Sequence, residues 1–520
     1  MSLNRRIFWS LTVPVAALVF SGCQQPSSNG ATATVAAAPS AAKAKVDPAA
    51  PVTLSPTHRI IPGNQVTALD RYVATPDPAY KWQVATNSTV AGGVVMTSID
   101  LTCQTWLTTN EVDKPVWRHW LNIYRPPEVA HSTAFLMITG GNNRDMKPPK
   151  PGNEMAMIAM ATKSVIAELK QVPSEPLVFV GDGKSRTEDE ILAFGWAKYL
   201  KTGEERWIGR LPMAKSAVRA MDTVTAFCAT PEGGSQKVDT FVVAGGSKRG
   251  WTTWATAEVD RRVVAIAPIV IDVLNLEPSF VHHWRAYGFW APAVGNYVEE
   301  GVMDWPGTPE YAALRKIEDP FEYRERLTLP KLMVNACGDQ FFLPDSSQFY
   351  FADLKGPKYL RYVPNADHSL KGSDAYETLT AWHYVNLNKI TVPRFSWTHP
   401  TPGSAKLTLT DRPRKVKLWQ ATNPAARDFR LETLGAKWTS TDLAPDANGE
   451  VIGKVEAPAA GYTAYMVECT YDVGTLVPLK LTTDVRVIPD TYPFAAPSPS
   501  KLKGFLSGSP AAGQKPRTAN

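Results

Sequence analysis

Four apolar runs, separated by stretches of helical character, limit the possible folds of this chain more than any other feature. The runs are residues 241–244, 263–271, 332–336 and 359–363. Strands buried on both faces of a sheet read as continuous apolar runs, so the pattern predicts a mostly parallel sheet covered by helices. Three earlier strands are predicted at residues 94–101, 116–124 and 134–138.

Length and charge narrow the class of protein further. The 520 residues, of which 44% are hydrophobic and 20% charged, suffice for a large core and more than one domain, and they exclude a collagen, a coiled coil and full-length disorder. The net charge of +6 comes from the two ends, because residues 1–46 and 491–520 each carry four basic residues and no acid. The near-neutral remainder argues against nucleic acid as a partner.

The chain opens with a basic and then apolar segment. Arg5 and Arg6 precede the apolar run 7–20, and two small residues follow before Cys23. This is the pattern of a secretory signal peptide, which we place at residues 1–22. The apolar run is too short to span a bilayer core, so a permanent transmembrane helix is disfavoured.

Cys23 follows Ser21 and Gly22 and resembles a bacterial lipobox cysteine, whose thiol is acylated and which becomes the new N-terminus. Phe20 departs from the usual leucine, which leaves ordinary cleavage and a secreted protein as the alternative. In such signals, Gln24 in place of aspartate indicates the outer membrane. We expect an exported lipoprotein of the outer membrane that faces the periplasm or the cell surface.

Composition changes twice along the rest of the chain. Residues 23–65 are rich in Ala, Pro, Ser and Thr and read as a disordered linker. After the α/β region, short β-prone runs broken by Pro, Gly, Asn and Asp predict a small all-β sandwich. The expected domains are an α/β domain at 66–390, a β-sandwich at 391–490 and a disordered tail at 491–520.

Four cysteines lie in the expected domains, at Cys103, Cys228, Cys337 and Cys469. They contain no C-x-x-C pair and no metal-ligand spacing. Export permits disulfides, and four cysteines allow three pairings. The spacing leaves these pairings and buried free thiols equally open.

A glycine turn after one apolar run carries the first chemical signal. Gly245, Gly246 and Ser247 follow the strand at 241–244 and precede a predicted helix. This resembles the nucleophile elbow of α/β-hydrolases, where small residues permit a sharp turn and a serine attacks the substrate. Arg249 stands where the G-x-S-x-G pattern has its second glycine, and a helix N-cap is the alternative role of Ser247.

An acid and a histidine follow two later strands. Asp339 comes just after the run 332–336, and His368 follows 359–363, in the Ser–Asp–His order of α/β-hydrolases. His368 would take the Ser247 proton and return it to the leaving group, while Asp339 would orient the imidazole. A turn aspartate and a loop histidine are the alternative roles. Three other acids compete for the role of Asp339: Asp272, Asp345 and Asp367.

A hydrolase of this kind also needs two backbone N–H groups aimed at the developing oxyanion. The N–H of Lys248, directly after the serine, is the predicted first donor. Gly140 and Gly141 follow the strand at 134–138, so the second donor is expected from Gly141 or Asn142. A flexible turn is the alternative role of this glycine pair.

Several of these stretches together resemble one known family. They are residues 69–73, 245–251, 319–327, 338–345 and 365–369. The sequence resembles the PhoPQ-activated pathogenicity-related proteins and the related autocrine proliferation repressors, over about residues 69–385. The resemblance implies an exported α/β-hydrolase with a β-rich C-terminal region and a link to virulence. The Gly-Gly-Ser-Lys-Arg-Gly stretch is shared by that family, which accounts for the departure from G-x-S-x-G.

The long segment 274–327 between two predicted strands is rich in aromatic residues. Insertions at this position commonly form a cap over a hydrolase site, so Trp284, Tyr287 and Trp290 are predicted to contact substrate. The adjacent His282 and His283 would diverge on a helix and lack further ligands, so no metal is expected.

We therefore expect an α/β-hydrolase fold with a cap insertion and a small C-terminal all-β sandwich. The expected activity is acyl transfer from an ester or amide to water without a cofactor, on a small-molecule or peptide substrate. An exopeptidase is one alternative, in which Glu299 and Glu300 would hold the free amine of the substrate, although a solvated helix face is the favoured role of these two acids. The other is a signalling or binding module that performs no chemistry on a hydrolase scaffold.

Overall fold

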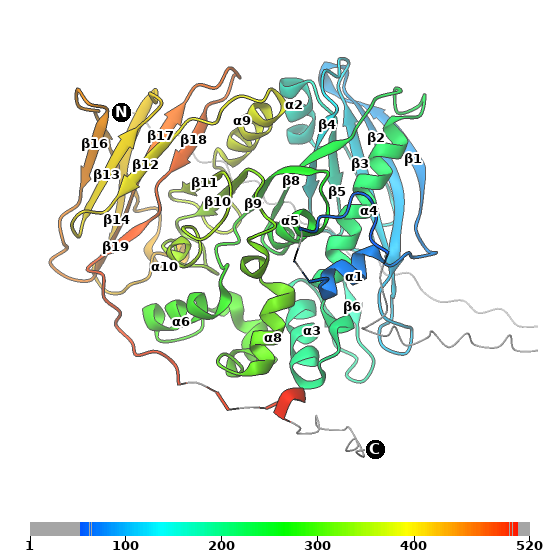
Figure 1. Ribbon diagram of the computed structural model, residues 1–520, viewed down its shortest axis with the longest axis horizontal. Helices are drawn as coiled ribbons and strands as arrows, with labels where there is room; N and C mark the ends of the chain where they lie inside the picture. Colours follow the sequence, from blue (N-terminus) through cyan, green and yellow to red (C-terminus); the bar gives the residue numbers. More distant parts are fainter. Residues whose placement is uncertain (1–52, 62, 64, 499, 502, 508–520) are drawn as a thin grey trace, which may run out of the picture. The chain divides into compact units, whose positions relative to one another are not determined.

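The computed structural model describes residues 53–61, 63, 65–498, 500–501 and 503–507 (Figure 1). The predicted signal peptide, Cys23 and most of the expected linker lie outside these residues. Within the described part of the chain, no helix is both long enough and apolar enough to cross a membrane.

A large mixed sheet forms the centre of the α/β region. Its strands are β1 (Lys81–Thr89), β2 (Val95–Thr105), β3 (Val116–Arg125), β4 (Thr133–Ile138), β5 (Ile166–Leu169), β8 (Thr240–Gly246), β9 (Val263–Ile269), β10 (Lys331–Ala336) and β11 (Lys358–Val363). They lie in the order β1-β2-β3-β5-β4-β8-β9-β10-β11, antiparallel from β1 to β5 and parallel from β5 to β11. This order, with β5 between β3 and β4, is that of the α/β-hydrolase fold, as the sequence predicts.

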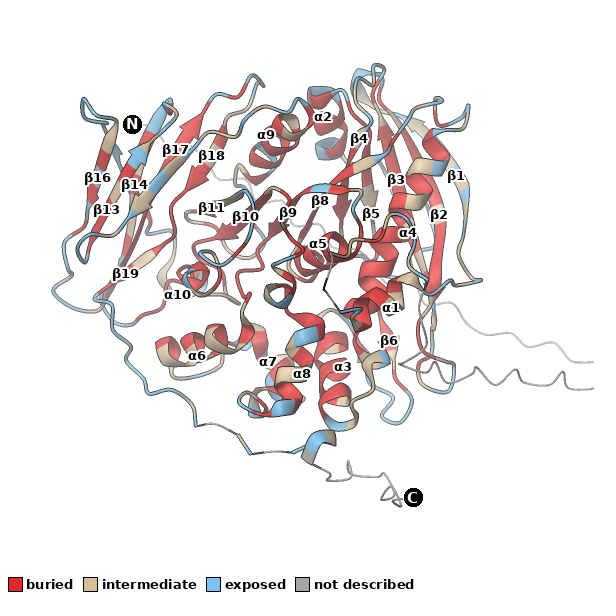
Figure 2. Ribbon diagram, in the orientation of Figure 1, coloured by how far each residue is buried: buried red, intermediate tan, exposed pale blue. Residues whose placement is uncertain are grey.

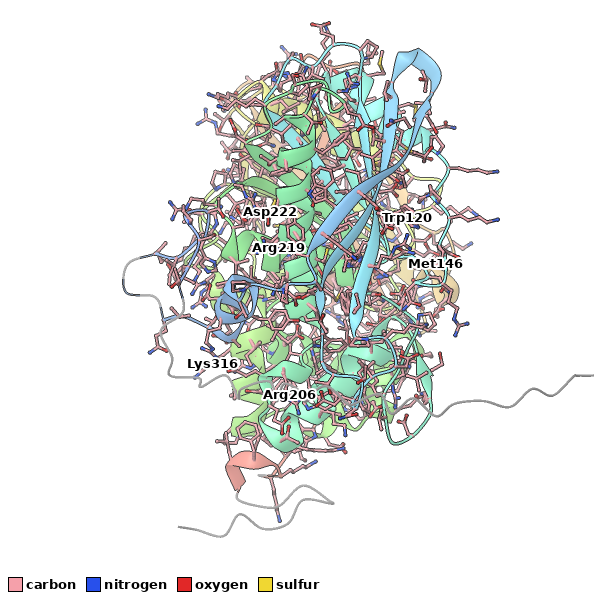
Figure 3. The ribbon with its side chains drawn as sticks, turned by 90° about the vertical axis from the view of Figure 1, so that its right-hand side faces the viewer. Trp120, Met146, Arg206, Arg219, Asp222 and Lys316 are labelled. Atoms are coloured by element: carbon pink, nitrogen blue, oxygen red, sulfur yellow. The ribbon has the colours of Figure 1, made fainter. Side chains whose placement is uncertain are left out.

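Helices cover both faces of the sheet because the strand residues alternate between two cores. Val243 of β8 packs with α4 (Arg210–Cys228) and α5 (Lys248–Val259), and α1 (Ala68–Ala74) joins the same core. Val242 and Ala244 point the other way, toward α2 (Asn153–Thr162) and α9 (Ala375–Leu387). Figure 2 shows the central strands buried between these helices. Figure 3 views the side on which Arg219 and Asp222 of α4 pair at 2.8 Å.

The predicted cap segment is a set of short helices between β9 and β10. They are α6 (Leu276–Tyr287), η3 (Pro292–Val294), α7 (Gly295–Glu299), η4 (Val302–Asp304), α8 (Pro309–Glu318) and η5 (Pro320–Tyr323). Thr308 starts α8 by accepting the N–H of Tyr311 at 3.2 Å, and Pro309 fills its first turn. In Figure 1, α6 and α8 lie below the sheet, and α8 lies beside α3 (Asp189–Thr202).

The C-terminal strands form two sheets that share one core. They are β12 (Phe395–Thr398), β13 (Ser404–Leu409), β14 (Lys415–Asn423), β15 (Thr439–Leu443), β16 (Glu450–Lys454), β17 (Tyr462–Tyr471), β18 (Leu479–Thr482) and β19 (Arg486–Ile488). β12, β13 and β16 form a separate sheet, whereas β18 pairs with β11, so the other strands extend the main sheet. Leu407 of the separate sheet and Leu418 of the extended sheet lie in one apolar cluster.

The join between β11 and the C-terminal strands is polar and buried. Arg361 of β11 donates to Glu468 of β17 at 2.5 Å, and the backbone N–H of Tyr362 donates to the Thr482 hydroxyl at 3.0 Å. The pairing of β11 with β18 makes the main sheet continuous between the two regions, and the ion pair joins β11 to β17.

Some described residues before the α/β region and after the β region contact the folded chain. His58, within the expected linker, lies 2.7 Å from Asp70. In the expected tail, the N–H of Phe494 donates to the Arg285 carbonyl at 3.2 Å, and the ring of Phe505 lies 5.7 Å from that of Tyr199. Buried apolar and polar partners thus hold parts of both stretches in place.

The four cysteines of the folded region are free thiols. Cys103, Cys228, Cys337 and Cys469 are each buried, and none of them is paired among the described residues. Burial raises the pKa of the Cys228 and Cys469 thiols to about 12, which keeps these thiols protonated.

Candidate active site

Ser247 lies in strained backbone at the turn between β8 and α5. Its φ of 58° and ψ of −124° fall in a region that non-glycine residues rarely adopt. Its hydroxyl makes no capping hydrogen bond to α5, although it occupies the N-cap position. Strain of this kind persists where the surrounding structure enforces it, which is common at functional sites.

The glycines around Ser247 are required by close packing. A Cβ at Gly245 would lie 2.6 Å from the carbonyl oxygen of Arg249, and one at Gly250 would lie 2.8 Å from that of Ile269. Because Ile269 belongs to β9, this strand leaves no room for a side chain at position 250, whereas position 249 holds an arginine. This explains why the second glycine of the turn is displaced by one residue from the G-x-S-x-G pattern.

Asp339 and His368 lie together at the ends of neighbouring strands. Nδ1 of His368 is 2.8 Å from Oδ2 of Asp339, and Oδ1 of Asp339 accepts the backbone N–H of Phe341 at 2.8 Å. Gln340 accepts the backbone N–H of His368 at 3.1 Å, and the centre of the Phe341 ring lies 4.3 Å from that of the imidazole. The carboxylate and the Phe341 ring thus fix the orientation of the imidazole, while Gln340 holds the backbone of His368.

The opposite nitrogen of the same imidazole is unoccupied. Nε2 of His368 is buried and has no hydrogen-bond partner among the described residues. Ser247 follows β8, which is parallel to β9, β10 and β11, so it lies at the same edge of the sheet as Asp339 and His368. The structure joins Asp339 to His368 directly, and no hydrogen bond between described atoms joins either residue to Ser247.

The three competing acids have other partners. These are Tyr350 and Tyr362 for Asp272, His282 and Arg427 for Asp345, and Ser369 for Asp367. Burial raises the pKa of Asp272 to about 7, beyond what its tyrosine hydrogen bonds offset. For Asp345, burial acts in the same direction, but Arg427 and His282 outweigh it and lower the pKa of the carboxyl. These acids therefore have structural surroundings of their own.

The loop predicted to supply the second oxyanion donor is anchored on both sides. The carbonyls of Thr139 and Gly140 accept the N–H groups of Val172 and Gln171 at 3.1 and 3.0 Å. The N–H groups of Gly141 and Asn142 donate to no described residue. Lys248 begins α5, where helix N–H groups are free of intrahelical partners. The structure therefore leaves both Gly141 and Asn142 as possible second donors.

A carboxylate pair holds the side chain of Lys248. Its Nζ lies 2.7 Å from Asp189 and 2.9 Å from Glu188, and Tyr297 of α7 donates to Asp189 at 3.1 Å. The cap is thereby tied to the residue after Ser247. Nothing in the sequence indicates these partners of Lys248, which lie at the start of α3.

The predicted substrate-contacting aromatics differ in exposure. Tyr287 is buried, with the Arg430 guanidinium 5.1 Å from its ring, so it is part of the cap core. Trp284 and Trp290 are half-buried, and the centres of their rings lie 5.2 Å apart. The Trp290 ring also lies 5.5 Å from His283, which contacts the backbone of Phe341. The tryptophans therefore connect through His283 to Phe341, whose ring lies against His368.

Two of the stretches that carry the family resemblance support the fold. Asp70 accepts from both Nη groups of Arg326, at 2.8 and 3.0 Å, and joins α1 to the chain after η5. Asp319 accepts the N–H groups of Leu276 and Phe321 at 2.8 and 3.0 Å, which fixes the start of α6. The resemblance thus includes buried anchors of the cap and the first helix.

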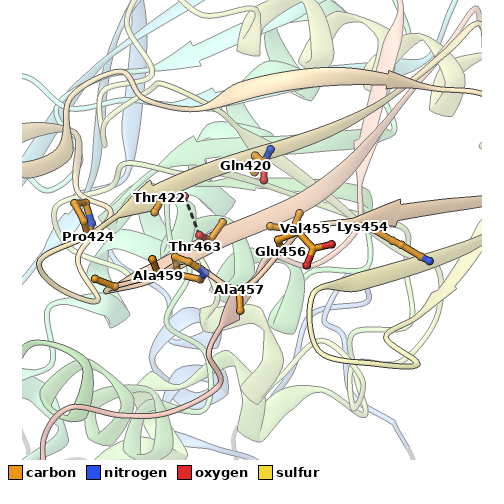
Figure 4. Close-up of a pocket in the computed structure, with 11 residues that line it drawn as sticks. Gln420, Thr422, Pro424, Lys454, Val455, Glu456, Ala457, Ala459 and Thr463 are labelled. Atoms are coloured by element: carbon orange, nitrogen blue, oxygen red, sulfur yellow. Dashed lines mark hydrogen bonds between the residues drawn. The ribbon is translucent and has the colours of Figure 1, made fainter.

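A separate hollow of about 610 Å³ lies in the C-terminal β region (Figure 4). It is lined by residues of β14, β16, β17 and the connection 455–460, and Thr422 and Thr463 hydrogen-bond at 2.8 Å beside it. None of the residues predicted for the triad or the oxyanion hole lines this hollow.

The strand order, the strained serine turn and the Asp339–His368 pair define a protein of the α/β-hydrolase class. The chain belongs to the family described as PhoPQ-activated pathogenicity-related protein, which matches residues 69–430. It is 37% identical over 460 residues to autocrine proliferation repressor protein A of Dictyostelium discoideum, covering 83% of this chain and 92% of that protein.

Solved structures show more distant likeness. An acetyl xylan esterase from Paenibacillus sp. R4 is 14% identical with a TM-score of 0.43, over 62% of this chain and 91% of the esterase. The acylaminoacyl peptidase of Pyrococcus horikoshii is 14% identical with a TM-score of 0.36, over 60% of this chain and 50% of the peptidase.

Proposed function

We propose that the protein is an exported serine hydrolase that transfers the acyl group of an ester or amide to water. In this proposal Ser247 is the nucleophile, His368 the base and Asp339 the acid that orients the base. The observation that carries it is the His368 imidazole, bound to Asp339 through Nδ1 and unpartnered at its buried Nε2. A buried nitrogen without a partner costs on the order of 1–3 kcal/mol, which is expected where it serves a reaction.

The residues account for each step of acyl transfer. His368 Nε2 takes the proton of Ser247 as the hydroxyl oxygen attacks the carbonyl carbon. The N–H of Lys248 and that of Gly141 or Asn142 stabilise the oxyanion of the tetrahedral intermediate. The imidazolium, stabilised by Asp339, then protonates the leaving group, and water repeats the sequence on the acyl-enzyme.

The charges near the cap favour this activity over the exopeptidase alternative. A substrate ammonium would need a free carboxylate, but Glu300 lies 3.4 Å from Arg186 and Glu299 lies 4.0 Å from Lys184. Both acids already have basic partners. The pairing of Glu300 with the buried Arg186 therefore argues against the exopeptidase alternative.

Export and a lipid anchor complete the proposal and are supported by the sequence alone. The basic start, the apolar run and Cys23 suggest a lipoprotein held at the outer membrane by acyl chains. We extend the proposal to virulence on the family description, which a Ser247→Ala strain compared with wild type in an infection assay would test.

A substrate panel tests the activity. We expect purified protein to hydrolyse p-nitrophenyl esters, and Ser247→Ala and His368→Ala each to lose nearly all of that rate, because triad members act as a unit. Hydrolysis restricted to aminoacyl anilides would favour the exopeptidase. No turnover of either class, with no labelling by a fluorophosphonate, would favour a non-catalytic module.

A further inference from the structure

Arg249 lies directly behind the turn that carries Ser247, and its side chain is buried. The residue is 8% exposed, and it stands where G-x-S-x-G elbows carry a glycine. Its guanidinium donates through Nη1 and Nη2 to the two oxygens of Glu188, at 2.7 and 2.8 Å. This bidentate geometry fixes the plane of the guanidinium as well as its position.

The same guanidinium contacts the loop after β4, the strand that pairs with β8. Its Nε donates to the carbonyl of Val172, whose own N–H donates to Thr139 at 3.1 Å. A Cβ on Gly140 would overlap the guanidinium, so Gly140 packs directly against it. The guanidinium therefore lies between the serine turn and the residues just before Gly141.

The backbone of Glu188 is fixed by its own conformation and by a hydrogen bond. Its φ of 51° and ψ of −125° are strained, and its N–H donates to Glu175 at 2.6 Å. Its carboxylate also receives Lys248 Nζ at 2.9 Å. The first two residues of α5 are thus attached to one partly exposed carboxylate at the start of α3.

We propose that Arg249, held by Glu188, is a positioning residue that sets the separation of the two halves of the oxyanion hole. One half is the Lys248 N–H on the serine turn, and the other is the Gly141 or Asn142 N–H on the opposing loop. Oxyanion donors act only within about 0.5 Å of their productive positions, so a rigid spacer between them controls turnover. This inference rests on the proposed serine hydrolase function.

The test compares Arg249→Lys and Glu188→Gln with wild type in kcat, KM and affinity for a trifluoromethyl ketone. That inhibitor forms a tetrahedral adduct whose oxyanion needs both donors. We expect kcat to fall by about 10²-fold with KM nearly unchanged, and inhibitor affinity to fall in parallel. Arg219→Lys, a matched change on the outer side of α4, should leave all three values at wild type.

Arg249→Gly restores the G-x-S-x-G pattern and sharpens the test. We expect it to lose turnover as Arg249→Lys does, since the spacer is missing. If the Arg249 variants do not fold, the near-isosteric Glu188→Gln decides the question alone. The inference would be overturned if Glu188→Gln kept the wild-type kcat and inhibitor affinity. It would also be overturned if the fraction of unfolded protein fully explained the loss of kcat in this variant.

The two proposals fail in distinguishable ways. If Ser247→Ala abolishes turnover while Glu188→Gln and Arg249→Lys keep it, the positioning role alone is wrong. If Ser247→Ala keeps turnover, or wild type shows neither turnover nor labelling, the serine hydrolase proposal is wrong and this inference is wrong with it.

Discussion

Asp339 Oδ2 lies 2.8 Å from Nδ1 of His368, although the two residues belong to loops that leave different strands. These strands, β10 and β11, are parallel neighbours in which Ala336 is opposite Val363, so their loops leave the sheet side by side. The second carboxylate oxygen is occupied by the Phe341 N–H. Asp339 can therefore hold the imidazole in one tautomer and one orientation.

Replacing Asp339 by Asn should nearly abolish turnover while leaving the fold intact. The amide keeps the shape of the carboxylate but stabilises the wrong tautomer of His368 and cannot stabilise the imidazolium. We expect kcat to fall by about 10⁴-fold with a melting temperature near that of wild type. Steady-state kinetics on the best p-nitrophenyl ester measure this effect.

Asp367→Asn is the matched control, because Asp367 adjoins His368 but accepts hydrogen bonds from Ser369. It should retain turnover within a few-fold of wild type. A severe loss in Asp367→Asn together with a mild loss in Asp339→Asn would show that the wrong acid has been assigned.

The strands and the order of Ser247, Asp339 and His368 could be predicted from the sequence because each residue follows a buried apolar run. The sequence favours Asp339 as the acid but does not exclude Asp272 or Asp345, which also come after predicted strands. What separates them are partners such as Tyr350 and Arg427, which are distant in sequence. Pairings of this kind depend on the three-dimensional arrangement of loops.

The join between the two regions was also beyond sequence reasoning. A change in composition near residue 391 predicts separate β strands, but the backbone pairing of β11 with β18 leaves no periodicity in the sequence. Arg249 is a similar case: its charge suggests an exposed side chain, whereas the structure buries it against Gly140 and Glu188.

Trp290→Ala should change substrate preference more than stability. Trp290 is half-buried beside Trp284 and connects through His283 to the loop after Asp339. We expect the ratio of kcat/KM for long and short acyl esters to change about tenfold, as expected for loss of an apolar pocket wall. Tyr287→Ala, at a buried position, should instead lose about 3 kcal/mol of unfolding free energy. The interpretation is wrong if Trp290→Ala lowers all rates equally and lowers the melting temperature as much as Tyr287→Ala.

The Asp70–Arg326 pair should make stability depend on pH in the acid range. Burial opposes ionisation of Asp70, but hydrogen bonds from His58 and Arg326 outweigh it and lower the pKa to about 2, from 3.8 when unperturbed. Because the pKa of Asp70 is lower in the folded state than in the unfolded state, its ionised carboxylate stabilises the fold above about pH 4, and this contribution is lost as the pH falls toward 2. The contribution to the free energy of unfolding amounts to about 2 kcal/mol. In urea unfolding, the advantage of wild type over Asp70→Asn should shrink between pH 5 and 2.5; an unchanged difference would contradict the assignment.

Cys23→Ser should move the protein out of the membrane fraction or leave an uncleaved precursor. About 30 residues separate Cys23 from Thr53, where the described chain begins, and a flexible linker of that length would have a span on the order of 30 Å. Turnover of a purified protein that starts at Thr53 should equal that of the full chain, since this start keeps the contact of His58 with Asp70 and the site lies in the folded region. Fractionation and N-terminal mass spectrometry measure this; a wild-type protein that is wholly soluble with another N-terminus would make the lipobox a coincidence.

Covalent labelling of Ser247 tests the central claim most directly. Wild type treated with a fluorophosphonate, digested and analysed by mass spectrometry should carry one adduct, on Ser247, and should lose ester hydrolysis in step with labelling. Ser247→Ala should remain folded and unlabelled, because only a hydroxyl is removed. An adduct on another residue, or full labelling of Ser247→Ala, would contradict the assignment of Ser247 as the nucleophile.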